Sequence, residues 1–138
     1  MNLEKREEIQ ASFQACETTE SIYQTIMEWG KKLPPFPEEE KREENLVSGC
    51  QSLLYLHTEM REGKVYFSAT TDALISAGLA ALLITFYNGV SPETLLTTPP
   101  SFLEEWNIPA SLTPGRANGL ASLFQKMQRD SLKFLTSR

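Results

Sequence analysis

Apolar residues recur at helical spacing in the first third of the chain and predict two helices there. The first helix begins near Asn2, and the second is capped by Thr18 or Thr19, whose side-chain oxygen can accept a hydrogen bond from a free amide. The apolar positions are Leu3, Ile9 and Phe13 in the first helix, then Ile22, Ile26 and Trp29 in the second. Gly30 is predicted to be the residue just after the second helix, and the prolines in 33–37 prevent its continuation.

Two short segments rich in aliphatic, aromatic and β-branched residues predict a β-hairpin. They span 51–57 and 64–69, and a polar stretch containing Glu62 and Gly63 separates them. The second segment alternates between two faces, with Val65, Phe67 and Ala69 on one and Lys64, Tyr66 and Ser68 on the other. This alternation is typical of a sheet that is covered on one side.

The stretch 73–92 carries no charge and so imitates a membrane span, but its continuous apolar part ends near Tyr87. About fifteen helical residues cover only ~22 Å of a hydrocarbon layer that is about 30 Å thick. We therefore predict a buried core helix, capped at its start by Asp72 with help from Thr71 and ended by Asn88-Gly89.

Three further helix starts follow in the sequence. They are marked by Ser91-Pro92, by the capping-box pattern of 101–104 and by Thr113-Pro114. In the last helix the predicted core stripe is Leu120, Leu123, Phe124, Met127, Ser131 and Phe134, with Lys126, Arg129, Asp130 and Lys133 outside it. The sequence thus predicts one α+β domain over residues 1–138, in which helices cover a small antiparallel sheet built on the hairpin.

Composition narrows the possible classes of site. The 138 residues are 41% hydrophobic and 22% charged, which is typical of one soluble globular domain that needs neither disulfides nor metal to fold. Two cysteines and one histidine exclude a disulfide scaffold, a zinc finger and a cysteine-held iron–sulfur cluster, because each needs more of these side chains.

The net charge of −5 comes from the first third of the chain. Residues 1–44 hold eleven acids against six bases, whereas residues 45–138 hold seven of each. The run 38–44 is predicted to be a solvated helical turn, and the lack of a basic cluster argues against DNA or RNA as a partner. The N-terminus has neither the apolar stretch of a secretory signal nor the composition of a transit peptide, so we predict a cytoplasmic location and no membrane partner.

The two cysteines lie in different settings. Cys16 follows Phe13 by three residues on an amphipathic helix and is predicted to be a small buried hydrophobe. Cys50 lies in a Ser-Gly turn before a strand, where a loop can expose a thiol and move it. The local pattern by itself leaves open whether Cys50 is functional.

A catalytic base for Cys50 is not predicted nearby. The one histidine is His57, and an extended strand would place it ~20 Å away, so it is predicted to be a surface or half-buried imidazole. A mobile cysteine without a base suits group carriage, because thiolate attack on an activated sulfur, such as the outer atom of a persulfide, removes no proton from a substrate.

At these residues the sequence resembles the SufE/CsdE family of sulfur acceptors. The matching blocks are Leu33-Pro34-Pro35, Asn45-Leu46-Val47-x-Gly49-Cys50-Gln51-Ser52, Thr71-Asp72-Ala73 with Gly78-Leu79, and Leu112-Thr113-Pro114-x-Arg116-x-Asn118-Gly119-Leu120. The departures are Thr71 where Ser is usual, Tyr55 where Trp is frequent and Gly115 where Ser is common. None of them touches the cysteine motif.

The resemblance implies a SufE/IscU-like fold and a persulfide-forming nucleophile at Cys50. It implies a supporting loop of Ser48, Gly49, Gln51 and Ser52 and makes Asp72 and Arg116 candidate partner contacts. Cys50 would take sulfane sulfur from a PLP-dependent cysteine desulfurase of the SufS type, activate that enzyme, and pass the sulfur to a SufBCD-type scaffold for iron–sulfur cluster assembly. The PLP would belong to the desulfurase. This chain would need no cofactor or metal and would act as a carrier rather than a stand-alone enzyme.

Two alternatives remain at this point. One is an independent thiol enzyme, either a hydrolase or a rhodanese-like sulfurtransferase acting on small molecules. The segment 46–52 brings none of the cations that would be expected around a rhodanese cysteine. The other is a non-catalytic interaction domain in which Cys50 is incidental.

Overall fold

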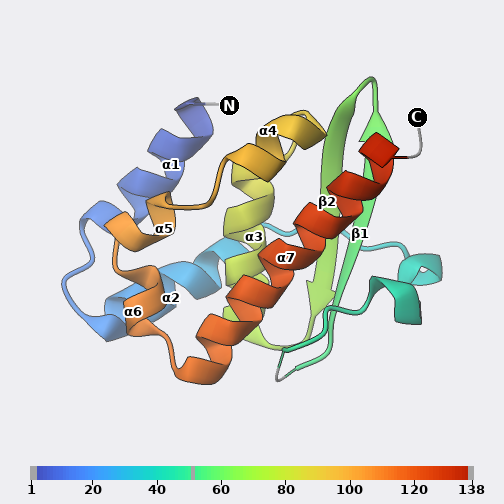
Figure 1. Ribbon diagram of the computed structural model, residues 1–138. Coiled ribbons are helices and arrows are strands. Elements are labelled where there is room, and N and C mark those ends of the chain that lie inside the picture. Colours follow the sequence, from blue (N-terminus) through green and yellow to red (C-terminus); the bar gives the residue numbers. More distant parts are fainter. Residues whose placement is uncertain (1–2, 51, 137–138) are drawn as a thin grey trace.

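A computed structural model describes residues 3–50 and 52–136 of the chain. The elements in chain order are α1 (Leu3–Gln14), α2 (Thr19–Gly30), the 3₁₀ turns η1 (Glu38–Glu40) and η2 (Glu43–Asn45), β1 (Leu54–Arg61), β2 (Lys64–Thr71), α3 (Leu74–Tyr87), α4 (Pro92–Thr97), α5 (Phe102–Glu105), α6 (Ile108–Ser111) and α7 (Pro114–Thr136). The apolar helix α3 lies at the centre, with the hairpin on one side and α1 and α2 on the other, and α7 crosses the hairpin obliquely (Figure 1). The predicted α+β architecture, a two-stranded antiparallel sheet with helices packed on it, is confirmed.

The predicted hairpin is present, but its first strand begins later than expected. The register runs from Leu54 opposite Thr71 to Arg61 opposite Lys64, and the two-residue turn between the strands has positive φ at both positions. The sequence placed the start of the strand at Gln51, which lies outside the described residues, whereas Ser52 and Leu53 belong to the preceding loop.

The two faces of the hairpin meet different partners. The core face carries Leu54, Leu56, Val65, Phe67 and Ala69, all buried. Helices α3 and α7 cover this face. On the other face Tyr55 packs near Phe36, and His57 contacts Glu40, so the segment 36–45 lies against the side away from the core.

Helix α3 is the buried core helix that the apolar run predicted. Ten of its residues are buried, and Asn88 and Gly89 follow its last residue, Gly89 with φ +87°. Within residues 3–50 and 52–136, no helix is long and apolar enough to cross a membrane.

The predicted cap of α3 by Asp72 is wrong. Ala73 occupies the cap position in extended conformation, and no side chain bonds the free amides of the first turn. Asp72 is exposed and one residue too early to reach those amides, while the Thr71 hydroxyl accepts a hydrogen bond from the Ala73 amide at 3.3 Å.

Gly30 also has a different role from the predicted one. It is the last residue of α2, Lys31 follows in right-handed helical conformation, and Gly30 therefore does not form a left-handed cap. Gly30 and Gly78 instead lie where α2 crosses α3. A Cβ atom at Gly30 would come within 2.8 Å of the Gly78 amide nitrogen, and one at Gly78 would overlap the Ile26 carbonyl oxygen. The two glycines therefore permit close approach of the helix backbones.

The helix starts agree with the sequence in some cases and not in others. Thr18 caps α2 through the Ser21 amide and Ser91 caps α4 through the Thr94 amide, as predicted. The capping box predicted at Ser101 is wrong, because Ser101 already has helical φ and ψ and its side chain makes no cap hydrogen bond. The short helix α6, which begins after Asn107 at φ 57°, was not predicted.

Two charged residues of α7 predicted to lie outside the core stripe are buried. Lys126 is 6% exposed and Asp130 9% exposed, and they pair at 3.2 Å. The Thr58 hydroxyl of β1 donates to Asp130 at 2.8 Å. These residues are buried because β1 packs on their side of α7 as well as on the apolar stripe. Buried charges are tolerated when they form an ion pair and accept or donate a further hydrogen bond, as here.

Candidate functional site

The Cys50 loop is pinned at its stem to the start of the hairpin. The Val47 amide donates to the Leu54 carbonyl at 2.9 Å, and Leu46 forms an isolated bridge with Tyr55. The tip between these points contains Gly49, whose φ of +89° favours glycine. The loop therefore leaves and re-enters the sheet over a narrow base.

Glycines allow the tip of this loop to lie against α7. A Cβ atom at Gly49 would overlap the Ser122 hydroxyl oxygen, and one at Gly119 would come within 3.5 Å of the Cys50 sulfur. The Cys50 thiol, which is half-buried, donates to the Gly119 carbonyl at 3.7 Å. Burial raises the pKa of the Cys50 thiol above its ordinary value. This conformation therefore favours the protonated thiol over the thiolate.

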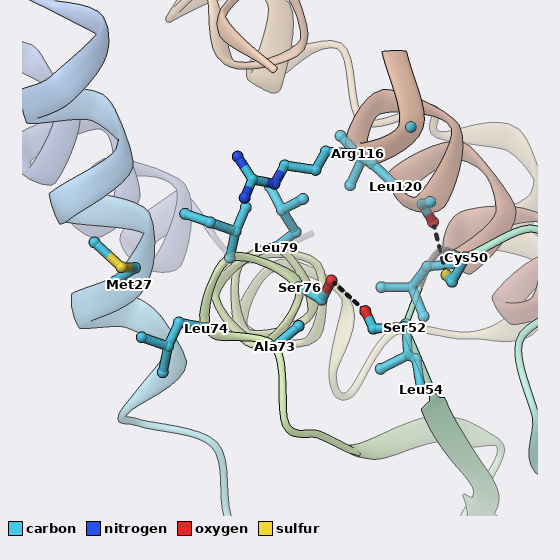
Figure 2. Close-up of a pocket in the computed structure, with 14 residues that line it drawn as sticks. Met27, Cys50, Ser52, Leu54, Ala73, Leu74, Ser76, Leu79, Arg116 and Leu120 are labelled. Atoms are coloured by element: carbon cyan, nitrogen blue, oxygen red, sulfur yellow. Dashed lines mark hydrogen bonds between the residues drawn. The ribbon is translucent and has the colours of Figure 1, made fainter. Parts of the chain in front are cut away.

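Cys50 lies at the wall of a pocket of about 450 Å³ between α2, α3, α7 and the start of β1. The described lining residues are Met27, Cys50, Ser52, Leu54, Ala73, Leu74, Ile75, Ser76, Leu79, Gly115, Arg116, Gly119, Leu120 and Leu123 (Figure 2). Most of this wall is apolar, and of the described lining residues Arg116 alone carries a formal charge. Ser52 and Ser76 share a hydrogen bond at 3.3 Å across the pocket wall.

The structure brings one of the two candidate partner contacts to this pocket. The Arg116 side chain extends over the pocket (Figure 2). Its guanidinium carbon lies 5.4 Å from the centre of the Tyr23 ring. Asp72 is exposed and does not line the pocket. Of the predicted supporting loop, Ser52 lines the pocket, Ser48 is exposed, Gly49 packs near Ser122, and Gln51 lies outside the described residues.

His57 lies on a different face from the Cys50 pocket. Leu54 and Leu56 of β1 point into the core, whereas His57 faces the segment 36–45 with its Nδ1 3.2 Å from the Glu40 carboxylate. The Arg42 guanidinium, which donates to Glu40, lowers the pKa of that carboxyl, and His57 and Asn45 act in the same direction. This cluster around Glu40 attaches the segment before the loop to the outer face of β1, and no local pattern in the sequence predicted it.

Cys16 lies two residues after the end of α1 and is half-buried, rather than a fully buried residue of the helix as predicted. Its sulfur lies 3.3 Å from the Thr25 hydroxyl and donates to the Ser21 carbonyl at 3.6 Å. It packs against the hydrophobic core and does not line the Cys50 pocket. The two thiols therefore occupy separate sites.

Some residues of the pocket were not singled out from the sequence. Gly119 belongs to the last of the sequence blocks that match the family, so the sequence marked its position. Nothing in the sequence predicted its contact with Cys50. Ser76 is a polar residue in an otherwise apolar segment, and nothing in the sequence pairs it with Ser52.

Comparison with known proteins shows which family this chain resembles. Residues 7–131 match the family described as "SufE: Fe-S metabolism associated domain". The chain belongs to the SufE family. This SufE-family protein is 38% identical over 122 residues to an uncharacterized SufE-like protein of Synechocystis sp., covering 88% of this chain and 77% of that protein.

Two further similarities extend the comparison. The SufE-family chain is 33% identical over 129 residues to the chloroplastic/mitochondrial SufE-like protein 1 of Arabidopsis thaliana, covering 93% of this chain and 35% of the plant protein. It thus spans about a third of that relative. The solution structure of a hypothetical protein from Thermus thermophilus superposes with a TM-score of 0.79 at 28% identity over 99% of both chains.

Proposed function

We propose that Cys50 accepts sulfane sulfur from a persulfide on a PLP-dependent cysteine desulfurase of the SufS type, stimulates that enzyme, and delivers the sulfur to a SufBCD-type scaffold. The observation that carries this proposal is the placement of Cys50, in a SufE-family chain, on a narrow-based loop beside an apolar pocket. The test is intact mass spectrometry after incubation with desulfurase, PLP and cysteine, in which this chain gains one sulfur atom.

The transfer step balances without a redox partner. The Cys50 thiolate attacks the outer sulfur of the partner's persulfide, a new S–S bond forms, and the partner's own S–S bond breaks. The partner's cysteine leaves as a thiolate. Cys50 loses one proton on ionising and the partner's thiolate later takes up one proton, so the step leaves the number of protons unchanged. Because burial raises the pKa of Cys50, docking must move the thiol out of its place against α7 before it ionises readily.

The proposal assigns PLP to the partner and makes this chain a carrier without a cofactor of its own. Persulfide attack needs no proton abstraction from the substrate, which fits a thiol whose pocket wall has no histidine or carboxylate among the described residues. The cytoplasmic location stays a prediction, since one relative is named for chloroplasts and mitochondria.

His57→Gln tests the proposal against the rival, an independent Cys-His enzyme. We expect persulfide uptake to stay within a few-fold of wild type, because His57 lies on the face of β1 away from the Cys50 pocket. The loss of a general base would cost roughly 100-fold or more. The measurement is the rate of sulfur gain by mass spectrometry, and a loss of that size in a folded variant would favour the rival.

Arg116→Ala is expected to weaken desulfurase stimulation several-fold with little loss of stability. Arg116 is the charged residue of the described pocket wall. A cation in the first turn of α7 opposes the helix dipole, which offsets the stabilising contact of Arg116 with the Tyr23 ring. Partner titrations give the affinity, and thermal melts give the stability.

Asp72→Ala tests the other candidate partner contact in the same titrations. Since Asp72 is exposed and caps nothing, its replacement should not cost the ~1 kcal/mol of a lost cap. If Arg116→Ala melts early yet stimulates normally once folded, Arg116 is a structural residue rather than a partner contact.

A further inference from the structure

The loop that carries Cys50 is attached to the hairpin at its base and to α3 and α7 at its tip. Its base is held by the Val47–Leu54 backbone bond and the Leu46–Tyr55 bridge. From the described residues of the tip, two side-chain hydrogen bonds reach other elements: Cys50 to Gly119 and Ser52 to Ser76 (Figure 2). Opening the tip would break both of these bonds.

These two bonds differ in what they depend on. The Cys50 bond to the Gly119 carbonyl is long, at 3.7 Å, and uses the thiol proton. That proton is lost when the thiol ionises, and the inner sulfur of a persulfide has none. The hydroxyl pair of Ser52 and Ser76 does not change with the state of Cys50.

Ser76 is well placed to fix the loop. It belongs to the first turns of α3, the helix with ten buried residues, and so it provides a rigid point of attachment. Ser52 lies two residues after Cys50, so its bond to Ser76 attaches the chain close to the thiol. Both serines are half-buried and line the same pocket as Cys50.

We propose that Ser76 is a positioning residue for Cys50: its hydrogen bond to Ser52 holds the loop closed and keeps the thiol against α7, and release of this bond frees Cys50 for transfer. The proposal concerns the thiol on which the proposed function rests. Access to this thiol is measured without any partner. If Ser76 does not control access, the proposed sulfur transfer is unaffected, and if sulfur transfer fails, the role of Ser76 in access is unaffected.

The experiment measures the alkylation rate of Cys50 by iodoacetamide, followed by intact mass, in a Cys16→Ala background. Ser76→Ala and Ser52→Ala should each raise the rate about fivefold, the effect on an opening equilibrium of one ordinary hydrogen bond. The double variant should react no faster than either single one, because both changes remove the same bond. Ser76→Thr, which keeps a hydroxyl, should react at the wild-type rate.

The pH profile supplies a second readout of the exposure of Cys50, and the Ser76→Thr variant separates loop opening from loss of stability. Because burial raises the pKa of Cys50, opening the loop should move the inflection of the rate to lower pH. The other ionisable side chain of the described pocket wall is Arg116. Ser101→Ala, at an exposed serine whose side chain makes no cap hydrogen bond, is the control and should change neither rate nor inflection.

Three results would overturn the proposal. One is an unchanged rate in Ser76→Ala, and another is multiplication of the two single effects in the double variant. The third is a Ser76→Thr protein that reacts as fast as Ser76→Ala.

Discussion

Cys50→Ser is expected to abolish sulfur uptake while the protein folds normally. A serine oxygen cannot form a persulfide, yet it is close in size to the thiol and can donate to the Gly119 carbonyl in its place. Intact mass spectrometry should show no gain of sulfur after incubation with desulfurase, PLP and cysteine. Stimulation of the desulfurase should be lost in the same sample, since the acceptor atom is missing.

Cys16→Ala is the matched control for the acceptor residue. Its sulfur lies among Ser21 and Thr25, apart from the Cys50 pocket, so sulfur uptake and stimulation should be largely unchanged. A Cys50→Ser protein that still stimulates the desulfurase fully would contradict transfer through Cys50.

Gly78→Ala is expected to cause a large loss of stability, about 3 kcal/mol or more. In an open helix the same change would stabilise by up to about 1 kcal/mol, because alanine is the better helix former. Here the new Cβ atom would overlap the Ile26 carbonyl oxygen, and backbone cannot move aside as a flexible side chain can. The helices α2 and α3 must therefore separate. Denaturant unfolding measures the loss.

Gly63→Asn provides a control glycine without such a neighbour. Gly63 has φ +79° in the hairpin turn, and no atom lies within 4 Å of the position that its Cβ would take. Asparagine tolerates positive φ, so the expected loss of stability is below about 1 kcal/mol. A Gly78→Ala protein as stable as this control would show that α2 and α3 are not held in close contact.

The elements that the sequence predicted are those whose signals are local. The hairpin, the caps at Thr18 and Ser91, and the end of α3 at Gly89 each depend on residues within a few positions of one another. The signal at Ser101 was equally local but failed, because the backbone there is already helical.

The candidate site was predicted in part. A motif of adjacent residues identifies Cys50 and its glycine turn, and a second motif identifies Arg116, but only the fold brings both to one pocket. Asp72 shares a sequence block with residues near the pocket, yet it is exposed and does not line it. The order of residues in a motif does not determine whether a side chain faces the pocket or the solvent.

The sequence by itself determined the class of fold, the core helix, the hairpin and the cysteine to consider, because hydrophobic period, turn residues and motif order are properties of the chain. The tertiary structure alone decided which groups meet: Ser52 with Ser76, Thr58 with Asp130, and Gly30 with Gly78. Each of these contacts joins residues of different elements. Its distance is set by how helices and strands pack against one another, and no local pattern records that packing.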